Sequence, residues 1–162
     1  MAISNYTELK SSIANWLHRT DLDSIIPDFI MLAENRINGD LDARFQDSIA
    51  SINTVAGTET VDLPTDLINI RHVSVETNPV RTLKYTTPDQ FEFTYPYSAT
   101  GLPVIYTVIG SKLYMSPTPD GAYPLDIVYK ARVPALSDAN VTNFLITHYP
   151  HVYLFAALCE SA

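Results

Sequence analysis

The stretch PLDIVYKAR, residues 124–132, carries the most regular pattern in the chain and decides its fold class. Largely apolar side chains alternate along it with more polar ones: Leu125, Ile127, Tyr129 and Ala131 against Asp126, Val128, Lys130 and Arg132. Successive side chains of a strand point to opposite faces of a sheet. The alternation therefore predicts a strand with one face in a core and the other face more solvated.

Similar but shorter segments precede this strand, rich in β-branched and aromatic residues and separated by Gly, Pro, Asn and Asp. They predict six more strands, at residues 47–54, 59–63, 70–77, 80–85, 103–108 and 112–116. Ala56-Gly57-Thr58 and Ile109-Gly110-Ser111 have the composition of hairpin turns, and PTPDG at 117–121 that of a longer rigid turn. Hairpin turns predict antiparallel pairing. Residues 46–132 are thus expected to form an antiparallel β domain, with a short helix near 88–95.

The first 45 residues have helical periodicity instead. Asn5 with Glu8 three positions later has the spacing of a capping box, which predicts a helix over residues 5–18. Pro27 is suited to the first turn of a second helix that runs to about residue 42. Gly39 is either its C-cap or an interior weak point. Together these segments predict an antiparallel helical hairpin at residues 1–45.

The last segment, residues 133–162, is expected to form a loop and a C-terminal helix that returns to the helical part. Pro150 is placed to begin this helix, which is apolar around much of its circumference. The predicted fold class is α+β: an N-terminal helical hairpin and a C-terminal helix packed with an antiparallel β-sandwich or barrel-like domain.

Composition excludes several classes of protein. The 162 residues suit one compact body, and 46% hydrophobic against 17% charged residues excludes disorder as the main state. A net charge of −8 disfavours sequence-independent binding to DNA, because phosphates would be repelled. Cys159 stands alone, so no internal disulfide can form, and Met1–Tyr6 lacks a secretion signal. The longest apolar run, Val152–Cys159, is far below the roughly 20 residues that span a bilayer.

Candidate chemical groups all have plainer explanations. His148 and His151 are three residues apart near Cys159 and Glu160, but Pro150 between them and their aromatic neighbours favour packed or capping histidines over a metal site. Asp21, Asp23 and Asp28 resemble part of a calcium loop, yet isoleucines stand where that loop needs an oxygen ligand and glycine. Nucleophile and phosphate-loop motifs are missing. We expect no catalytic residues, no metal and no cofactor, and therefore no enzyme.

Tyrosine is the unusual residue, with ten copies. Nine of them lie in the second half of the chain: Tyr85, Tyr95, Tyr97, Tyr106, Tyr114, Tyr123, Tyr129, Tyr149 and Tyr153. Tyrosine suits protein interfaces, because it buries a large area and keeps a polar hydroxyl. Packing within a sheet explains the same residues equally well, so both interpretations stay open.

A series of short motifs along the whole chain resembles the head-to-tail adaptor proteins of tailed bacteriophages, which form the ring below the portal in short-tailed phages. The motifs are YTEL (6–9), WL (16–17), RTDL (19–22), IPDFI (26–30), LAE (32–34), RIN (36–38), VAGT (55–58), LPTD (63–66), PTPDG (117–121) and ARVPALSD (131–138). The resemblance implies a ring of roughly a dozen copies at the head–tail junction of the virion, made in the host cytoplasm. It implies the portal protein and the tail nozzle protein as partners, with DNA passing through unbound. Similar proteins continue beyond the position of Ala162.

The ring would need side-to-side contacts between copies, for which we expect the helical hairpin and the terminal helix to serve. The predicted interface residues are Arg36, Arg44, Arg132, Asp40, Asp42, Asp138, Tyr149, Tyr153 and Phe155. The arginines would pair with the aspartates across the joint. Two alternatives are a carbohydrate- or protein-binding β module of a virion tail, with tyrosines as its platform, and a small hydrolase.

Overall fold

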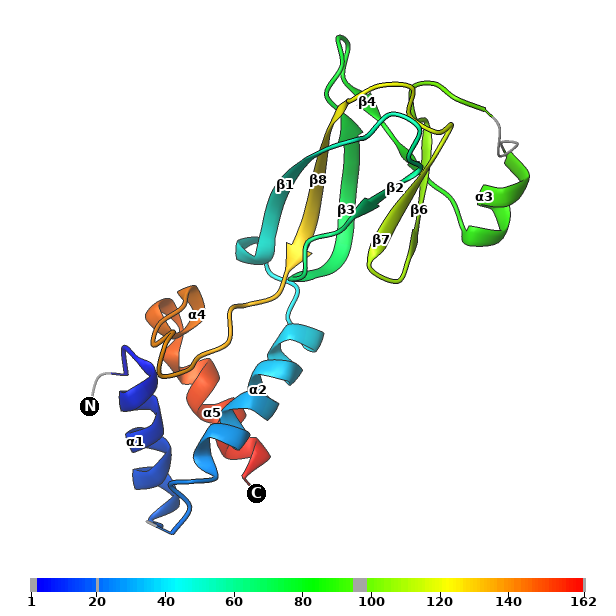
Figure 1. Ribbon diagram of the computed structural model, residues 1–162. Helices are drawn as coiled ribbons and strands as arrows, with labels where there is room; N and C mark the ends of the chain where they lie inside the picture. Colours follow the sequence, from blue (N-terminus) through cyan, green and yellow to red (C-terminus); the bar gives the residue numbers. More distant parts are fainter. Residues whose placement is uncertain (1–2, 20, 95–98, 162) are drawn as a thin grey trace. The chain divides into compact units, whose positions relative to one another are not determined.

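The computed structural model describes residues 3–19, 21–94 and 99–161 (Figure 1). The chain divides into two compact units, a helical unit of residues 1–43 and 132–162 and a β unit of residues 44–131. The β unit is therefore inserted between two segments that together form the helical unit. Helices and two sheets in one chain confirm the α+β class. Thr20 of the RTDL motif and residues 95 and 96, where the short helix was expected to end, lie outside the described residues.

The first helix, α1, spans Tyr6–Leu17 and begins as expected. The side-chain oxygen of Asn5 accepts a hydrogen bond from the backbone N–H of Glu8 at 2.9 Å, so Asn5 is the N-cap. The Glu8 carboxylate accepts from the backbone N–H and the hydroxyl of Ser4, both at 2.7 Å. In a regular capping box the Glu8 carboxylate would accept from the N–H of the N-cap, Asn5. Here it accepts from the N–H of the preceding residue, Ser4.

The second helix, α2, spans Ile26–Asp40 with Pro27 in its first turn. It runs antiparallel to α1 (Figure 1), which confirms the helical hairpin. Gly39 lies inside the helix, and Leu41 is the C-cap, donating its N–H to the carbonyl of Ile37 at 2.9 Å. The helix therefore ends two residues earlier than expected.

Two helices follow the β unit. The terminal helix, α5, spans Pro150–Glu160 and begins at the expected proline. A short helix before it, α4, spans Phe144–His148 and was not expected; Asn143 caps it by accepting from the N–H of Ile146 at 3.0 Å. α5 packs against α1, α2 and α4. The core of the helical unit is formed by Leu9, Ile13, Ile26, Ile30, Ala33, Leu145, Ile146, Tyr153 and Ala157.

The β unit consists of two four-stranded sheets. Sheet A has the order β1-β8-β3-β4, with β1 at Asp47–Asn53, β8 at Pro124–Ala131, β3 at Leu67–Val75 and β4 at Arg81–Thr82. Sheet B has the order β2-β7-β6-β5, with β2 at Thr60–Asp62, β7 at Lys112–Ser116, β6 at Ile105–Ile109 and β5 at Lys84–Tyr85. The 3-10 turn η1, Arg44–Gln46, precedes β1, and the short helix α3 spans Pro88–Thr94.

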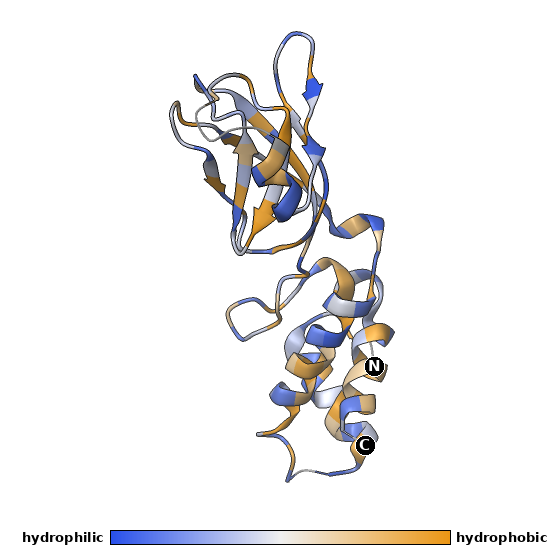
Figure 2. Ribbon diagram, turned by 90° about the vertical axis from the view of Figure 1, so that its right-hand side faces the viewer, coloured by the Kyte–Doolittle hydropathy of each residue, from blue (hydrophilic) through white to orange (hydrophobic). Residues whose placement is uncertain are grey.

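The strand β8 shows the predicted inner face, since Leu125, Ile127 and Tyr129 are buried. Its other face is drier than expected, because Lys130 is only 7% exposed. β8 is a central strand, paired with β1 on one side and β3 on the other. Neighbouring strands on both sides leave little room for solvent along the aliphatic stem of a lysine. Figure 2 shows hydrophobic and hydrophilic positions alternating along the strands.

One expected hairpin is confirmed and another is wrong. The turn at 109–111 joins β6 and β7, which pair antiparallel, and Gly110 takes a φ of 63° that favours glycine. The turn at 56–58 instead leads from sheet A to sheet B, because β1 pairs with β8 and β2 with β7. The Gly57 N–H donates to the carbonyl of Pro119 at 2.8 Å, so this connection is bound to the 117–121 turn and does not close a hairpin.

The segment expected as one strand at 80–85 divides between the two sheets. Leu83 is 3% exposed and donates its N–H to Val73 of sheet A, whereas the next residue, Lys84, donates to Val104 beside sheet B. β4 therefore ends in sheet A and β5 begins in sheet B. β5 pairs parallel with β6, which corrects the expectation of antiparallel pairing throughout. The two sheets enclose the apolar core, which contains Val61, Val73, Val75, Leu83, Tyr106, Leu113, Met115, Leu125, Ile127 and Tyr129.

We expect residues 44–131 to fold when expressed without the helical unit. Asp47 pairs with Lys130, so the two ends of this segment are neighbours, and its apolar core lies entirely within it. A closed core with adjacent ends is the usual property of an inserted domain. The excised segment should show one cooperative thermal transition and dispersed amide resonances. A random-coil spectrum would contradict the prediction.

Candidate functional site

Two polar residues of α2 hold the chain where it re-enters the helical unit after the β unit. The Glu34 carboxylate accepts hydrogen bonds from the Leu136 N–H at 2.8 Å and from the Tyr153 hydroxyl at 3.2 Å. The side-chain oxygen of Asn38 accepts from the Val133 N–H at 2.8 Å. Residues four apart share one face of a helix, so both side chains reach the same segment. Glu34 and Asn38 are buried, at 7% and 6% exposure.

Tyr153 completes this buried network and is not at the surface. It is 1% exposed, and its hydroxyl accepts from the Asn143 side-chain amide at 2.7 Å while donating to Glu34. Asn143 also donates to the carbonyl of Pro134 at 2.8 Å. Burial raises the pKa of both Tyr153 and Glu34. The expectation of Tyr153 as an interface residue is corrected, because its ring faces α2 and the core.

The network predicts a pH-dependent contribution to stability that belongs to Glu34. Burial raises the pKa of this carboxyl above its ordinary value near 4.5, more than its two hydrogen bonds lower it. The folded chain therefore holds this proton more tightly than the unfolded chain. The resulting stability is present below about pH 4.5 and is lost as the pH rises through the folded pKa.

We expect Glu34→Gln to abolish this dependence, since the amide oxygen can still accept while the charge is gone. Urea unfolding of both proteins in steps between pH 4 and pH 8 measures it. The free energy of unfolding of the original chain, minus that of the variant, should fall as the pH rises from 4.5 and then level off. The contributions of the other carboxyl groups are the same in both proteins and cancel in this difference. Parallel curves would contradict the prediction.

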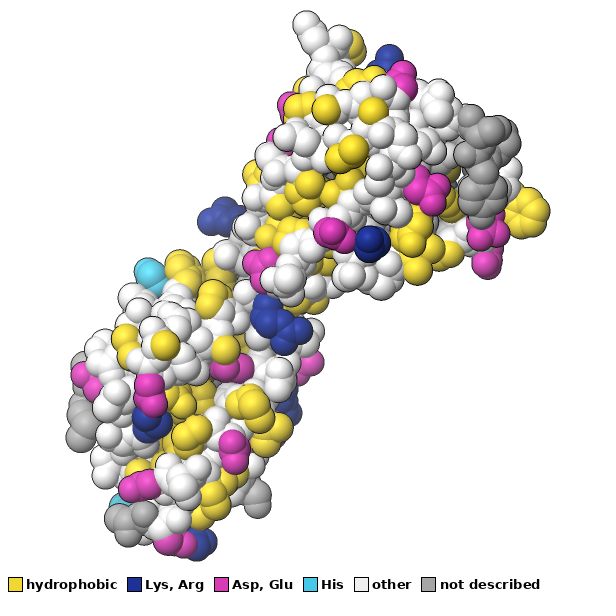
Figure 3. Space-filling model, in the orientation of Figure 1, with side chains coloured by type: hydrophobic (Ala, Val, Ile, Leu, Met, Phe, Trp, Pro, Cys, Tyr) yellow, Lys and Arg dark blue, Asp and Glu magenta, His cyan; other side chains and the backbone are white. Residues whose placement is uncertain are grey.

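An apolar surface on the outside of the helical unit is the strongest candidate for a contact site. We call it the α5 surface: Val152, Phe155 and Ala156 of α5 with Trp16 of α1. Phe155 is 54% exposed and Trp16 60%, and their rings meet edge to face with centroids 6.2 Å apart. Val152 and Ala156 line a groove of about 280 Å³ between α5 and the end of α2, where Ile37 and Leu41 continue the apolar lining. Figure 3 shows hydrophobic side chains, in yellow, on the surface of the helical unit. Clustered exposed apolar side chains of this kind mark interaction sites.

Charged residues border this surface. Arg36 binds Glu160, with Nη1 and Oε1 2.9 Å apart, and lies 3.9 Å from the carboxylate of Asp40. Glu160 raises the pKa of the Arg36 guanidinium, first by its hydrogen bond and then by its charge. Arg36 and Asp40 both line the groove. The structure thus brings three predicted interface residues, Arg36, Asp40 and Phe155, to one side of the helical unit.

The remaining predicted interface residues lie elsewhere. Arg44 is exposed in η1, Asp42 is exposed just before it, and Arg132 is exposed directly after β8. Asp138 accepts a hydrogen bond from Lys10 of the same chain at 3.1 Å. Tyr149 is 46% exposed and contacts Phe144 and His151. Pairing across a joint between copies stays a prediction for the arginines and aspartates.

Sequence reasoning missed Trp16, Glu34, Asn38 and Asn143. Glu34 and Asn38 fall on the same helical face as the apolar residues Ile30 and Ile37. Polar residues on an apolar face are a usable signal of a buried hydrogen-bond network. Trp16 had no such signal, because its position in the helix suits a core residue equally well.

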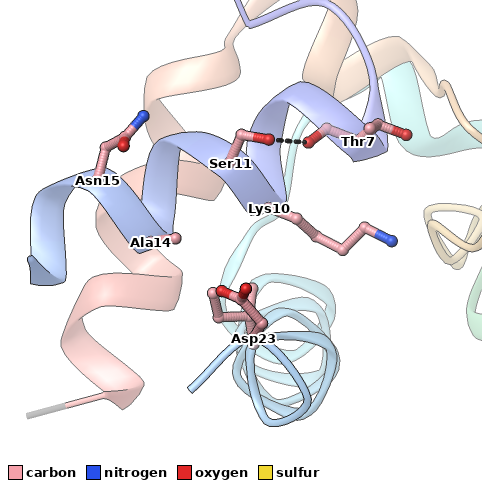
Figure 4. A pocket seen from close by; sticks show the side chains of 7 residues that line it. Thr7, Lys10, Ser11, Ala14, Asn15 and Asp23 are labelled. Carbon is pink, nitrogen blue, oxygen red and sulfur yellow. Dashed lines mark hydrogen bonds between the residues drawn. The ribbon is translucent and has the colours of Figure 1, made fainter. Parts of the chain in front are cut away.

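The hollow between α1 and the start of α2 does not bring acid and base together. Its volume is about 410 Å³, and Thr7, Lys10, Ser11, Ala14, Asn15, Asp23 and Ile26 line it (Figure 4). The Ser11 hydroxyl donates to the carbonyl of Thr7 at 3.1 Å. Lys10 points away from Asp23 (Figure 4); its ammonium binds Asp138 and lies 4.4 Å from the centre of the Tyr6 ring. The Ser11 hydroxyl and the Lys10 ammonium are thus each engaged by a neighbour.

The two histidines of the C-terminal segment, His148 and His151, contact aromatic residues. His148 stacks on Phe144 with ring centroids 4.3 Å apart, and its Nδ1 lies 3.0 Å from the carbonyl oxygen of Phe144. His151 meets Tyr149 edge to face at 6.3 Å. Among residues 3–19, 21–94 and 99–161, no three His, Cys, Asp or Glu side chains are grouped as metal ligands would be. No helix in the described part of the chain has both the length and the apolar character needed to cross a membrane.

Comparison with known protein families identifies the family of this chain. Residues 4–162 match the family described as SU10 adaptor protein. A comparison with curated proteins found no match. The family match extends over both units, and it confirms the resemblance to phage adaptors that the motifs indicated. The chain therefore belongs to the SU10 adaptor protein family and is a phage adaptor protein.

Proposed function

We propose that this adaptor forms a closed ring in the phage neck, which joins the portal to the tail nozzle and lets DNA pass. The observation that carries the proposal is the α5 surface, an exposed apolar groove and aromatic pair bordered by charges, on a member of an adaptor family. A ring of roughly a dozen copies buries one such surface at each joint. The ring would sit at the head–tail junction of the virion after synthesis in the host cytoplasm.

Ring closure requires that two different faces of the unit meet. The helical unit offers a second set of exposed apolar side chains, among them Met31, 53% exposed, on α2. Met31 and Arg36 are five residues apart, which places them about 140° apart around the helix. The α5 surface and the Met31 side of α2 are therefore distinct faces. One copy can present the first while its neighbour presents the second.

The charge of the chain suits a channel for DNA. Each copy carries −8, so a ring of many copies is a strongly acidic body. Negative potential along a channel repels phosphates and prevents the genome from adhering to the wall. We propose that weak contact with DNA is part of the function, and that the role is structural and not catalytic. The structural role is supported by the contacts that engage Lys10, His148 and His151 with neighbouring side chains.

Native mass spectrometry and electron microscopy of the chain mixed with the portal protein test the proposal. We expect a ring bound to the portal, with about twelve copies. A chain that stays monomeric and ignores the portal would contradict it. DNA binding measured in parallel at low salt should be undetectable.

A β module that binds carbohydrate or protein is the second candidate, favoured by one observation. Tyr85, 54% exposed, meets Tyr106 edge to face with centroids 5.6 Å apart beside a groove in the β unit. Exposed aromatic rings beside polar groups suit sugar or peptide ligands. A glycan array tests the carbohydrate form, which requires retention of a glycan by the original chain and its loss in Tyr85→Ala.

A further inference from the structure

The strand β3 has one edge that is paired over only part of its length. β8 pairs with β3 from Leu67 to Val75. On the opposite side, β4 pairs only with Ser74 and Val75, and Leu83 adds one hydrogen bond to Val73 (Figure 1). In the part of the chain that the structure describes, no strand pairs with that side of residues 67–72. Exposure follows pairing: residues 73–75 are buried, whereas residues 67–72 are half-buried or exposed.

A groove of about 460 Å³ runs along this unpaired edge. One wall is made by five consecutive residues, 67–71, and the other by Tyr85, Tyr106 and Val108. The pairing of β3 with β8 shifts register between Leu67 and Asn69 and again between Ile70 and His72. All five residues of 67–71 nevertheless line the groove, so the groove follows the chain along this edge. Five residues of strand extend over about 16 Å, the length of a short added strand. Unpaired edges of this kind are templates for another strand.

The opposite wall is apolar. Tyr106 and Val108 are two residues apart, so both point to the same face of β6. β5 covers β6 only at Ile105 and Tyr106, which leaves Val108 open to the groove. The groove therefore combines a backbone edge on one side with aromatic and aliphatic side chains on the other. This is the combination by which sheets bind extended peptides, with main-chain hydrogen bonds for affinity and pockets for alternate side chains.

Charge selects the kind of peptide. Residues 67–85 contain Arg71, Arg81 and Lys84 against the single acid Glu76, although the whole chain carries −8. Arg81 and Lys84 are exposed, whereas Arg71, which lines the groove, already binds Asp47 at 3.2 Å, so the attraction for an acidic segment comes from Arg81 and Lys84. A local excess of positive charge favours an acidic segment and increases its rate of encounter.

The free edge strands of this chain are poor occupants. β1 contains one acid, Asp47, which already binds Arg71 at 3.2 Å. β2 has three residues, and its acid, Asp62, lies 3.5 Å from Lys112. Neither strand offers unengaged acidic residues to the groove of a second copy.

We propose that the groove between β3 and β6 binds an extended acidic segment of a different protein, which adds to sheet A as a strand beside residues 67–72. The occupant places alternate apolar side chains against Tyr85, Tyr106 and Val108. Its acidic residues pair with the exposed Lys84, which directly precedes the groove-lining Tyr85, and with the exposed Arg81 of β4. The binding site lies within the β unit and does not depend on ring formation.

An NMR titration of the full chain with a capped eight-residue peptide that alternates valine with aspartate and threonine tests the proposal. Saturable shifts are expected at the amides of residues 67–72 and of Val108. Two further peptides carry N-methyl groups on alternate backbone amides, one on the odd and one on the even positions. Only one side of an added strand pairs with β3, so one peptide should bind at least tenfold more weakly and the other unchanged. A lysine-for-aspartate peptide should also bind at least tenfold more weakly.

Two variants with matched controls complete the test. Tyr85→Ala and Lys84→Glu should each weaken binding threefold or more. Their controls are Tyr149→Ala, of similar exposure in the helical unit, and Lys112→Glu on β7, and these should leave binding unchanged. Equal effects of the two methylated peptides, indifference to the lysine peptide, or shifts confined to other residues would overturn the proposal. Concentration-dependent broadening of amides 67–72 without peptide would assign the groove to a second copy and overturn it as well.

Discussion

Replacing Glu34 by alanine should lower the free energy of unfolding by about 3 kcal/mol. The substitution removes the acceptor of two buried donors, the Leu136 N–H and the Tyr153 hydroxyl. A buried donor left without an acceptor costs about 1–3 kcal/mol. At neutral pH the variant no longer has to bury the charged Glu34 carboxylate, which regains part of the lost stability. The cost of two unpaired buried donors is larger than this gain. We expect the segment after β8 to loosen from α2 first.

Urea unfolding followed by circular dichroism measures this loss. Asp40→Ala is the matched control, because Asp40 lies on the same helix and its side chain is 81% exposed. Its ion pair with Arg36, at 3.9 Å, contributes about 0.5 kcal/mol or less. Tyr153→Phe keeps the ring and removes the hydroxyl, so the double variant with Glu34→Ala should lose less than the sum of the two. A loss no larger than that of Asp40→Ala would mean that the network does not hold the segment.

Replacing Phe155 by aspartate should abolish the ring while leaving the fold intact. Phe155 is 54% exposed, and its ring contacts Trp16 at the surface. The free energy of unfolding of the variant should therefore lie within about 1 kcal/mol of that of the original chain. At a joint between copies, a buried aromatic anchor contributes about 2 kcal/mol or more. An unpaired charge adds a desolvation cost, and the penalty recurs at every joint of the ring.

Native mass spectrometry in the presence of portal protein distinguishes the outcomes. The variant should remain monomeric at concentrations where the original chain is fully assembled. Ile49→Asp is the control, because Ile49 is 67% exposed on β1, outside the α5 surface. An intact ring with Phe155→Asp would show that the joints lie elsewhere. If the original chain itself forms no ring with the portal protein, the proposed function is contradicted.

Most elements could be predicted because their signals are local. The alternation at 124–132 gave a strand, Asn5 gave a cap, and Pro150 marked the first residue of α5. Each signal depends on the period of a regular structure or on a backbone preference within a few residues. Asn143 is a cap residue of the same kind for α4, but the five-residue helix is too short to show a helical period in the sequence.

The errors concern partners that are distant in the chain. A turn composition at 56–58 could not reveal that β1 and β2 belong to different sheets. The composition of residues 80–85 suits a strand but could not reveal that Leu83 divides the segment between two sheets. Tyr153 was assigned to an interface because an aromatic residue on an apolar helix suits a core and a contact surface equally well.

By its sequence alone, this protein was an acidic α+β chain with a helical hairpin, an antiparallel β region and a likeness to phage adaptors. Only the tertiary structure decided that Glu34 and Tyr153 hold the re-entering chain, that Phe155 and Trp16 stay outside, and that β3 keeps an open edge. The physical reason is range. Periodicity and capping act between neighbours in the sequence, whereas burial and strand pairing depend on residues that only folding brings together.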